Sequence, residues 1–205
     1  GANLYNKGED IRMIGANVYG LLYLLGKDNI TELTQLKGRV VHSLGAGNTP
    51  EFIFKYALSQ AGIAYQNSDT VIDNDTVSIK YEEEATTIIQ KMVANQVQYA
   101  ILGEPQATMA ISKNSAFKVL FDLQEIYGGG YPQVATLAKG DLADNHKAFL
   151  AAFMNELKAN NEWAVANPDK VQSAMTESGS KITGLTADII TRCNIRFTEM
   201  KSALI

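Results

Sequence analysis

The chain has 205 residues, of which 46% are hydrophobic and 20% are charged, and its formal net charge is −4. This balance predicts a packed core in one large domain or two small lobes. It disfavours a nucleic-acid platform, because phosphate binding draws on clustered Lys and Arg, whereas the dense charge run KYEEE at residues 80–84 is acidic. No apolar run approaches the ~18 residues that a membrane span requires.

The first segments predict a helix end and two strands. ANLYNKGED reads as the last turn of a helix ending at Gly8, a residue suited to the left-handed conformation past a helix end. Because this helix lacks a beginning, we expect the chain to start inside a larger protein, so the missing signal peptide says little. Apolar residues and Tyr then predict strands at 12–18 and 21–26. A helical turn follows, capped by Asn29 or Thr31.

A strand that runs straight into a helix is the clearest local pattern. Residues 39–44, RVVHSL, lack alternation, as is typical of a strand covered on both faces. After a glycine-containing loop, Thr49 is a good N-cap and Pro50 suits the first helical position. Gly62 ends this predicted helix. The apolar side chains of the helix recur at helical spacing: Phe52, Ile53, Tyr56 and Ala57.

The middle of the chain repeats the pattern. A polar loop at 67–75 precedes a short strand, VSIKY, and then a helix, EEEATTIIQKMVANQ, whose three glutamates are placed in its first turn, where the helix dipole favours anions. VQYAIL at 97–102 is another unbroken apolar strand, and it leads through Glu104 into a helix that begins near Pro105.

The last third predicts more strands and helices. FKVLFDL and QVATLAK read as strands, separated by YGGGYP, whose three glycines suggest a hinge or a close backbone approach. One long amphipathic helix is expected at 144–167 with Phe149, Phe153 and Leu157 on its apolar face. Pro168 then opens another helix, TADIITRCN is helical, and IRFTEM is extended.

This order of elements predicts an α/β fold with mostly parallel strands. If strands 39–44 and 97–102 are parallel in one sheet, the two helices that follow them open on the same edge. Ligands in open α/β sheets bind beyond the carboxyl ends of the strands, so we expect a cleft at that edge.

The loop at 43–49 offers backbone N–H groups, hydroxyls and the positive end of a helix, which together form a ready anion site. A nucleotide P-loop is excluded because no Lys follows the glycines, and a dinucleotide fingerprint is weak because Pro50 occupies the third glycine position. The alternative is equally favoured: Gly45 and Gly47 only form a tight turn, and Thr49 only caps the helix.

Side chains for catalysis are sparse. Glu104 could bind a cationic or amide-bearing ligand, although a role as a capping carboxylate is slightly favoured. His42 is read as a satisfied core residue and His146 as a solvated one. Cys193, the single cysteine, is more consistent with a half-buried apolar role than with a reactive thiol. No metal-ligand spacing and no G-x-S-x-G elbow occurs, so we predict no catalytic residue, no metal and no cofactor.

Four segments in series carry a family resemblance: LKGRVVHSLGAGNTPEFIFKYALSQAGI, YAILGEPQATMAISKN, YPQVATLAKGDL and FLAAFMNELKANNEWAVANPDKV. They resemble the substrate-binding proteins of ABC importers, in the subgroup of aliphatic-sulfonate, taurine, nitrate and thiamine-pyrimidine binders. The resemblance implies a type II periplasmic-binding fold, in which two α/β lobes joined by two crossing segments close on a small polar or anionic ligand.

The resemblance also implies a ligand site. The GNTP loop would contribute helix N-terminal contacts, Glu104 would lie at the cleft, Asn17 and Tyr19 would lie near the first crossing, and Tyr131 near the second. The complete candidate set is Asn17, Tyr19, Ser43, Gly45, Gly47, Asn48, Thr49, Glu104 and Tyr131.

The lobes are expected at residues 21–126, complete, and at 1–20 with 127–205, where the family's first strands and helices are missing. The apolar surface left by that gap would be covered by a partner or a second copy. The resemblance implies an extracytoplasmic location, periplasmic or lipoprotein-anchored, and a membrane permease as partner. Alternatives are an enzyme on the same fold, of the thiamine-pyrimidine or menaquinone pathway type, and the ligand-sensing domain of a regulator.

Overall fold

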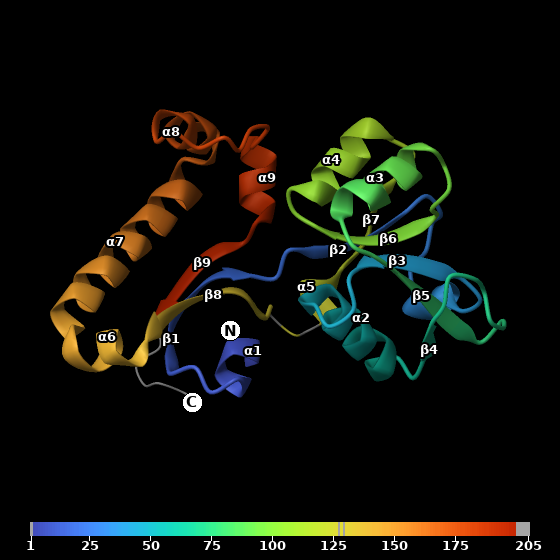
Figure 1. Ribbon diagram of the computed structural model, residues 1–205. Coiled ribbons are helices and arrows are strands. Elements are labelled where there is room, and N and C mark those ends of the chain that lie inside the picture. Colours follow the sequence, from blue (N-terminus) through green and yellow to red (C-terminus); the bar gives the residue numbers. More distant parts are fainter. Residues whose placement is uncertain (1, 127, 129, 200–205) are drawn as a thin grey trace. The chain divides into compact units, whose positions relative to one another are not determined.

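The chain folds into two compact units, each with its own sheet (Figure 1). This computed structural model describes residues 2–126, 128 and 130–199. Unit 1 comprises Gly1–Gly20 with Tyr131–Ile205, and unit 2 comprises Leu21–Gly130. The chain therefore leaves unit 1 once and returns to it once.

Unit 2 is built on a mixed six-stranded sheet with the strand order β4-β5-β3-β6-β2-β7. The pairs β4–β5, β5–β3 and β3–β6 are parallel, whereas β2 is antiparallel to both β6 and β7. The strands are β2 (Leu22–Gly26), β3 (Val40–Leu44), β4 (Ala64–Asn67), β5 (Thr76–Glu82), β6 (Tyr99–Gly103) and β7 (Lys118–Asp122).

Helices cover both faces of this sheet, which explains why β2 and β6 are buried at every position. Figure 1 shows α3 (Ala85–Val93) and α4 (Gln106–Lys113) on one face, with α2 (Thr49–Gln60) and α5 (Leu123–Ile126) on the other. The core under α3 and α4 joins both helices to alternate residues of the strands, and it includes Tyr23, Leu25, Ile88, Met92, Ala100, Leu102 and Phe117.

Unit 1 contains a three-stranded sheet in the order β8-β1-β9, in which β1 (Ile11–Tyr19) is antiparallel to β8 (Pro132–Lys139) and to β9 (Ile195–Glu199). Gly15 in β1 permits close approach of a helix, because a Cβ built there would lie 2.6 Å from the Met154 Cε atom. The helical elements are α1 (Ala2–Asn6), α6 (Gly140–Asn145), α7 (Lys147–Ala166), η2 (Pro168–Lys170), α8 (Val171–Glu177) and α9 (Ala187–Arg192).

The predicted α/β class is confirmed, and the predominance of parallel strands needs correction. Parallel pairing is confined to β3, β4, β5 and β6 of unit 2, and every strand pair described in unit 1 is antiparallel. The sequence also missed β4, because its residues AYQN are all exposed and carry no apolar pattern.

Several helix starts differ from the prediction. The 3₁₀ turn η1 (Leu33–Leu36) is capped at Glu32, and the Gln35 side chain accepts the N–H groups of Thr31 and Glu32. Residues 82–84 precede α3 instead of forming its first turn, since Glu82 ends β5 and Glu84 is the N-cap.

The long helix predicted at 144–167 is broken at His146, where the backbone leaves the helical region and separates α6 from α7. Its predicted apolar face is open: Phe149 and Phe153 are 59% and 44% exposed, and Met154 is the buried side chain. Likewise Phe52 and Tyr56 of α2 are exposed, while Ile53 and Ala57 are buried as expected.

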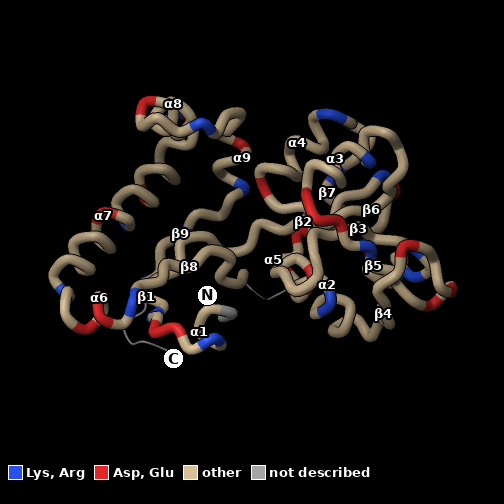
Figure 2. Tube along the Cα trace, in the orientation of Figure 1, with Lys and Arg blue, Asp and Glu red and all other residues tan. Residues whose placement is uncertain are grey.

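Charged residues are dispersed over both units, and the acidic stretch 82–84 leads into α3 (Figure 2). Among the described residues, no helix combines the length and hydropathy needed to cross a bilayer.

Candidate functional site

Strands β3 and β6 bring the two predicted turns to one edge of the unit 2 sheet. The strands are parallel neighbours, with Val41 opposite Tyr99 and His42 opposite Ala100. Their carboxyl ends therefore point the same way, and each is followed by a helix start. We call residues 45–48, between β3 and α2, the rim loop. Glu104 and Pro105 form the corresponding turn between β6 and α4.

The rim loop is exposed and tightly turned. Ala46, Gly47 and Asn48 are all exposed, and Gly47 has φ of +83°, a conformation that glycine adopts without strain. A Cβ at Gly45 would lie 2.9 Å from the side-chain amide nitrogen of Asn48, an exposed side chain that can move away. The loop conformation thus depends on glycine at position 47.

Helix α2 starts one residue earlier than expected. Asn48 is the N-cap, without a side-chain capping hydrogen bond, and Thr49 is already helical. Glu51, inside the helix, instead accepts the N–H of Gly47, the residue that precedes the N-cap. The prediction that Thr49 is the N-cap is therefore wrong.

Only some of the backbone N–H groups that the sequence predicted to be free in this loop lack an acceptor. The Gly45 N–H donates to the carbonyl oxygen of Glu82 at 2.9 Å, and the Gly47 N–H is used by Glu51. Within the described residues, no hydrogen bond of the chain uses the N–H of Ala46, Asn48 or Thr49. These three amides lie where the positive end of the α2 dipole is strongest, so they can receive a polar or anionic group.

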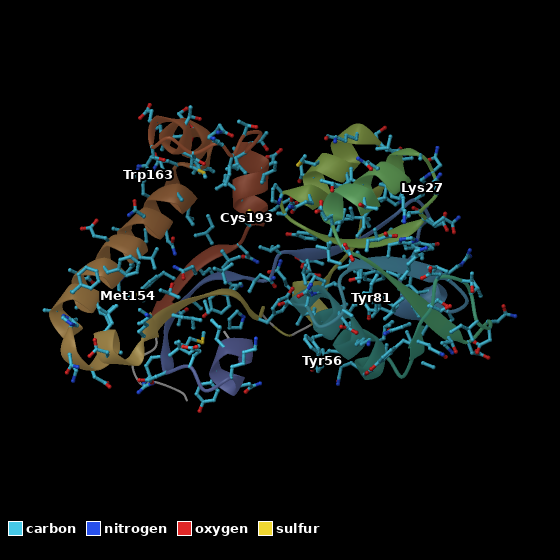
Figure 3. The ribbon with its side chains drawn as sticks, in the orientation of Figure 1. Lys27, Tyr56, Tyr81, Met154, Trp163 and Cys193 are labelled. Carbon is cyan, nitrogen blue, oxygen red and sulfur yellow. The ribbon has the colours of Figure 1, made fainter. Side chains whose placement is uncertain are left out.

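Glu51 lies at the centre of a polar network beneath the rim loop. It is only 7% exposed, and its carboxylate accepts hydrogen bonds from the Tyr81 hydroxyl at 2.6 Å and from the Lys55 ammonium at 2.5 Å. Tyr81 reaches it from β5 across the α2 side of the sheet (Figure 3). The same hydroxyl also lies 3.2 Å from the Asn67 side-chain oxygen on β4.

These contacts determine the ionisation states of Glu51 and Tyr81. Burial by itself raises the pKa of Glu51, but the hydrogen bonds from Gly47, Lys55 and Tyr81 outweigh it and lower that pKa to about 2. Burial, and then the hydrogen bond to the Glu51 carboxylate, raise the pKa of Tyr81 well above its usual range. At neutral pH, Glu51 is therefore ionised and Tyr81 is a hydrogen-bond donor.

The other two predicted polar residues of this edge are buried. Ser43 is fully buried within β3, and its hydroxyl lies 3.5 Å from the Leu44 carbonyl oxygen, which is long for a hydrogen bond. Glu104 is 5% exposed, and its carboxylate accepts the hydroxyl of Thr108 at 2.9 Å and the Thr108 N–H at 3.2 Å. Glu104 thus supplies a capping carboxylate for α4, the role that the sequence slightly favoured, although Pro105 occupies the N-cap position itself.

A second polar cluster, formed by His42, Glu82 and Lys91, lies one strand away. The His42 Nδ1 atom is 3.1 Å from the Glu82 carboxylate, which also pairs with Lys91. His42 is thus a satisfied core residue, as predicted. Burial lowers the pKa of His42 below its usual value, despite the nearby carboxylate. Burial also raises the pKa of Glu82, but its bonds to Lys91 and His42 lower it overall.

Unit 1 holds the three remaining candidates. Asn17 accepts a hydrogen bond from the Thr136 hydroxyl across the β1–β8 pair at 2.6 Å. The ring of Tyr19 lies 5.1 Å from the guanidinium carbon of Arg196. Tyr131 is buried, and its carbonyl oxygen accepts the N–H of Gly20 at 2.9 Å, so the residues flanking the two crossings between units are bonded to each other.

Sequence reasoning missed Glu51, Tyr81 and Lys55. Only the four-residue spacing from Gly47 to Glu51 and from Glu51 to Lys55 was visible as a signal. In the described part of the chain, no group of three or more His, Cys, Asp or Glu residues is arranged to hold a metal ion.

Comparison with known proteins identifies the family. The family model described as NMT1/THI5 like matches residues 5–171. The chain belongs to the NMT1/THI5-like family. A search of curated protein sequences found no match.

This NMT1/THI5-like chain is similar to two solved structures. An ABC transporter protein from Parabacteroides distasonis is 28% identical, with a TM-score of 0.76 over 97% of this chain and 65% of its own. The periplasmic aliphatic sulphonate binding protein SsuA from Escherichia coli is 16% identical and shows the same fold, with a TM-score of 0.73 and the same two coverages. The chain thus spans 65% of the length of these two proteins.

Proposed function

We propose that this NMT1/THI5-like chain is part of the extracytoplasmic solute-binding component of an ABC importer. The observation that carries this proposal is that β3 and β6, parallel neighbours, each lead to a helix start at one sheet edge. It is supported by the chain's similarity to an ABC transporter protein and to a periplasmic sulphonate binding protein. Strong, preformed donors at such an edge suit the capture of a small polar or anionic group.

The proposed ligand contacts divide between the units. In unit 2, the Ala46, Asn48 and Thr49 amides would bind the ligand directly, with the Gly45 and Gly47 turn holding them in place. Ser43 and Glu104 would complete that edge. In unit 1, Asn17, Tyr19 and Tyr131 lie close in sequence to the two crossings and are further candidate ligand contacts.

We further propose that unit 2 corresponds to one complete lobe and unit 1 to part of the other. Closure of the lobes around the solute would present the liganded form to a membrane permease, with affinity arising from better contact in the closed state. The location would be periplasmic or lipoprotein-anchored.

The proposal is tested by thermal unfolding of the natural-length protein with a ligand panel. Taurine, an alkanesulfonate, nitrate and an aminopyrimidine cover the chemistries considered. A true ligand raises the melting temperature by mass action, in proportion to the logarithm of its concentration. If no compound in the panel raises it, the solute-receptor proposal fails. Conversion of a bound compound to product would instead indicate an enzyme.

A further inference from the structure

Resting on this function, we propose that Glu51 is a positioning residue for ligand binding: its carboxylate holds the rim loop in the conformation that leaves the N–H groups of Ala46, Asn48 and Thr49 without an acceptor in the described part of the chain. Glu51 does not contact the ligand in this proposal. It acts through Gly47, whose N–H it accepts.

The first step of the argument is how the loop conformation is held. Gly47 lies at φ of +83°, and the space that a Cβ would occupy there is open, with no atom within 4 Å. Two N–H groups of the loop have described acceptors: the Gly45 N–H donates to the Glu82 carbonyl oxygen, and the Gly47 N–H donates to the Glu51 carboxylate. A hydrogen bond to an ionised carboxylate is the stronger of these two kinds.

The second step is how Glu51 itself is held. Tyr81 on β5 and Lys55 on α2 both donate to its carboxylate, and Lys55 lies 5.5 Å from the centre of the Tyr65 ring. With 7% exposure, Glu51 has little freedom to follow a moving loop. The network therefore ties the loop to the sheet through a side chain that is itself fixed.

The third step is the consequence for the site. Using Gly47 as an internal donor leaves the flanking N–H groups of Ala46, Asn48 and Thr49 for a ligand, on a loop already in its turned conformation. A preformed site avoids the entropy cost of ordering on binding, so loosening the loop lowers affinity without removing any ligand contact.

The test compares Glu51→Gln with Glu82→Gln by amide hydrogen exchange and by ligand binding. Both carboxylates are similarly buried, with side-chain exposures of 9% and 11%, and both bind a Lys. Glu82, however, holds the loop through its backbone carbonyl, which the substitution leaves intact. It is therefore a matched control for general destabilisation.

We expect Glu51→Gln to speed exchange at Gly47 by about tenfold or more, the effect of losing a charge-assisted bond, while Glu82→Gln leaves it within about twofold. One panel compound, such as taurine, is first shown to bind the wild-type protein. Its affinity should then fall more in Glu51→Gln than in Glu82→Gln. Unchanged Gly47 exchange in Glu51→Gln, or equal changes in both variants, would overturn the proposal. Absence of any binder contradicts the receptor function alone, because the exchange comparison needs no ligand.

Discussion

The Tyr81 hydroxyl donates a 2.6 Å hydrogen bond to the Glu51 carboxylate, joining β5 to the first turn of α2. This bond links a strand of the sheet to the helix that directly follows the rim loop. It makes the stability of unit 2 and the geometry of its candidate site depend on the same ionised group.

That dependence predicts acid sensitivity. The folded pKa of Glu51 is about 2, below the ordinary value of 4.5, so the folded state favours its ionised form. The resulting stabilisation is fully present above about pH 4.5 and is lost as the pH falls towards 2. Glu51→Gln should therefore cost about 1–3 kcal/mol at pH 7 and flatten the stability profile between pH 5 and 2. Urea unfolding between pH 7 and pH 2 measures both the loss of stability at pH 7 and the slope of the stability profile. The control is Glu83→Gln, which changes an exposed carboxylate. A wild-type slope retained in Glu51→Gln would contradict this assignment.

Gly47→Ala tests the backbone of the rim loop. Because the Cβ position is open, the cost should come from the positive φ alone, about 1–2 kcal/mol. Gly47→Asn should recover part of that loss, since Asn tolerates the left-handed region better than Ala. Chemical denaturation of the wild type, Gly47→Asn and Gly47→Ala should give unfolding free energies that decrease in that order. Equal stability of Gly47→Ala and the wild type would mean that the loop does not hold this conformation in solution.

His42 should titrate below its usual pKa of 6.5, because burial disfavours its charged form. The folded state then binds fewer protons than the unfolded state in that window, so this contribution to stability is present above pH 6.5 and is lost as the pH falls towards the depressed pKa. Lys91→Met removes a nearby positive charge and should raise the pKa of His42. An NMR titration of the imidazole resonances checks both directions, and a lower pKa in the variant would contradict the cluster geometry.

The open face of α7 predicts self-association of the 205-residue chain. Phe149 and Phe153 stack with ring centroids 6.5 Å apart while remaining largely exposed. Replacing both with Ser should shift sedimentation towards the monomer and change unfolding free energy by less than about 0.5 kcal/mol. Met154→Ala, at the neighbouring buried position, should instead cost about 2–5 kcal/mol. Equal sedimentation of the double variant and the wild type would show that this face is not the contact.

The two turns of the candidate site could be predicted because the signals are local. Unbroken apolar runs marked β3 and β6, and Pro50 and Pro105 marked the helices that follow. One topological assumption, that the strands are parallel in one sheet, then placed both turns at one edge, and the pairing of Val41 with Tyr99 confirms it.

The sequence by itself determined which residues form most strands and helices, because apolar period and glycine or proline positions act within a few residues. Only the tertiary structure decided that Gly47 is held by Glu51, that Tyr81 reaches the same carboxylate from 30 positions away, and that Phe149 stays exposed while Met154 is buried. The physical reason is that a side chain's hydrogen-bond partners and burial depend on what packs against it, and strand order brings those neighbours from distant parts of the chain.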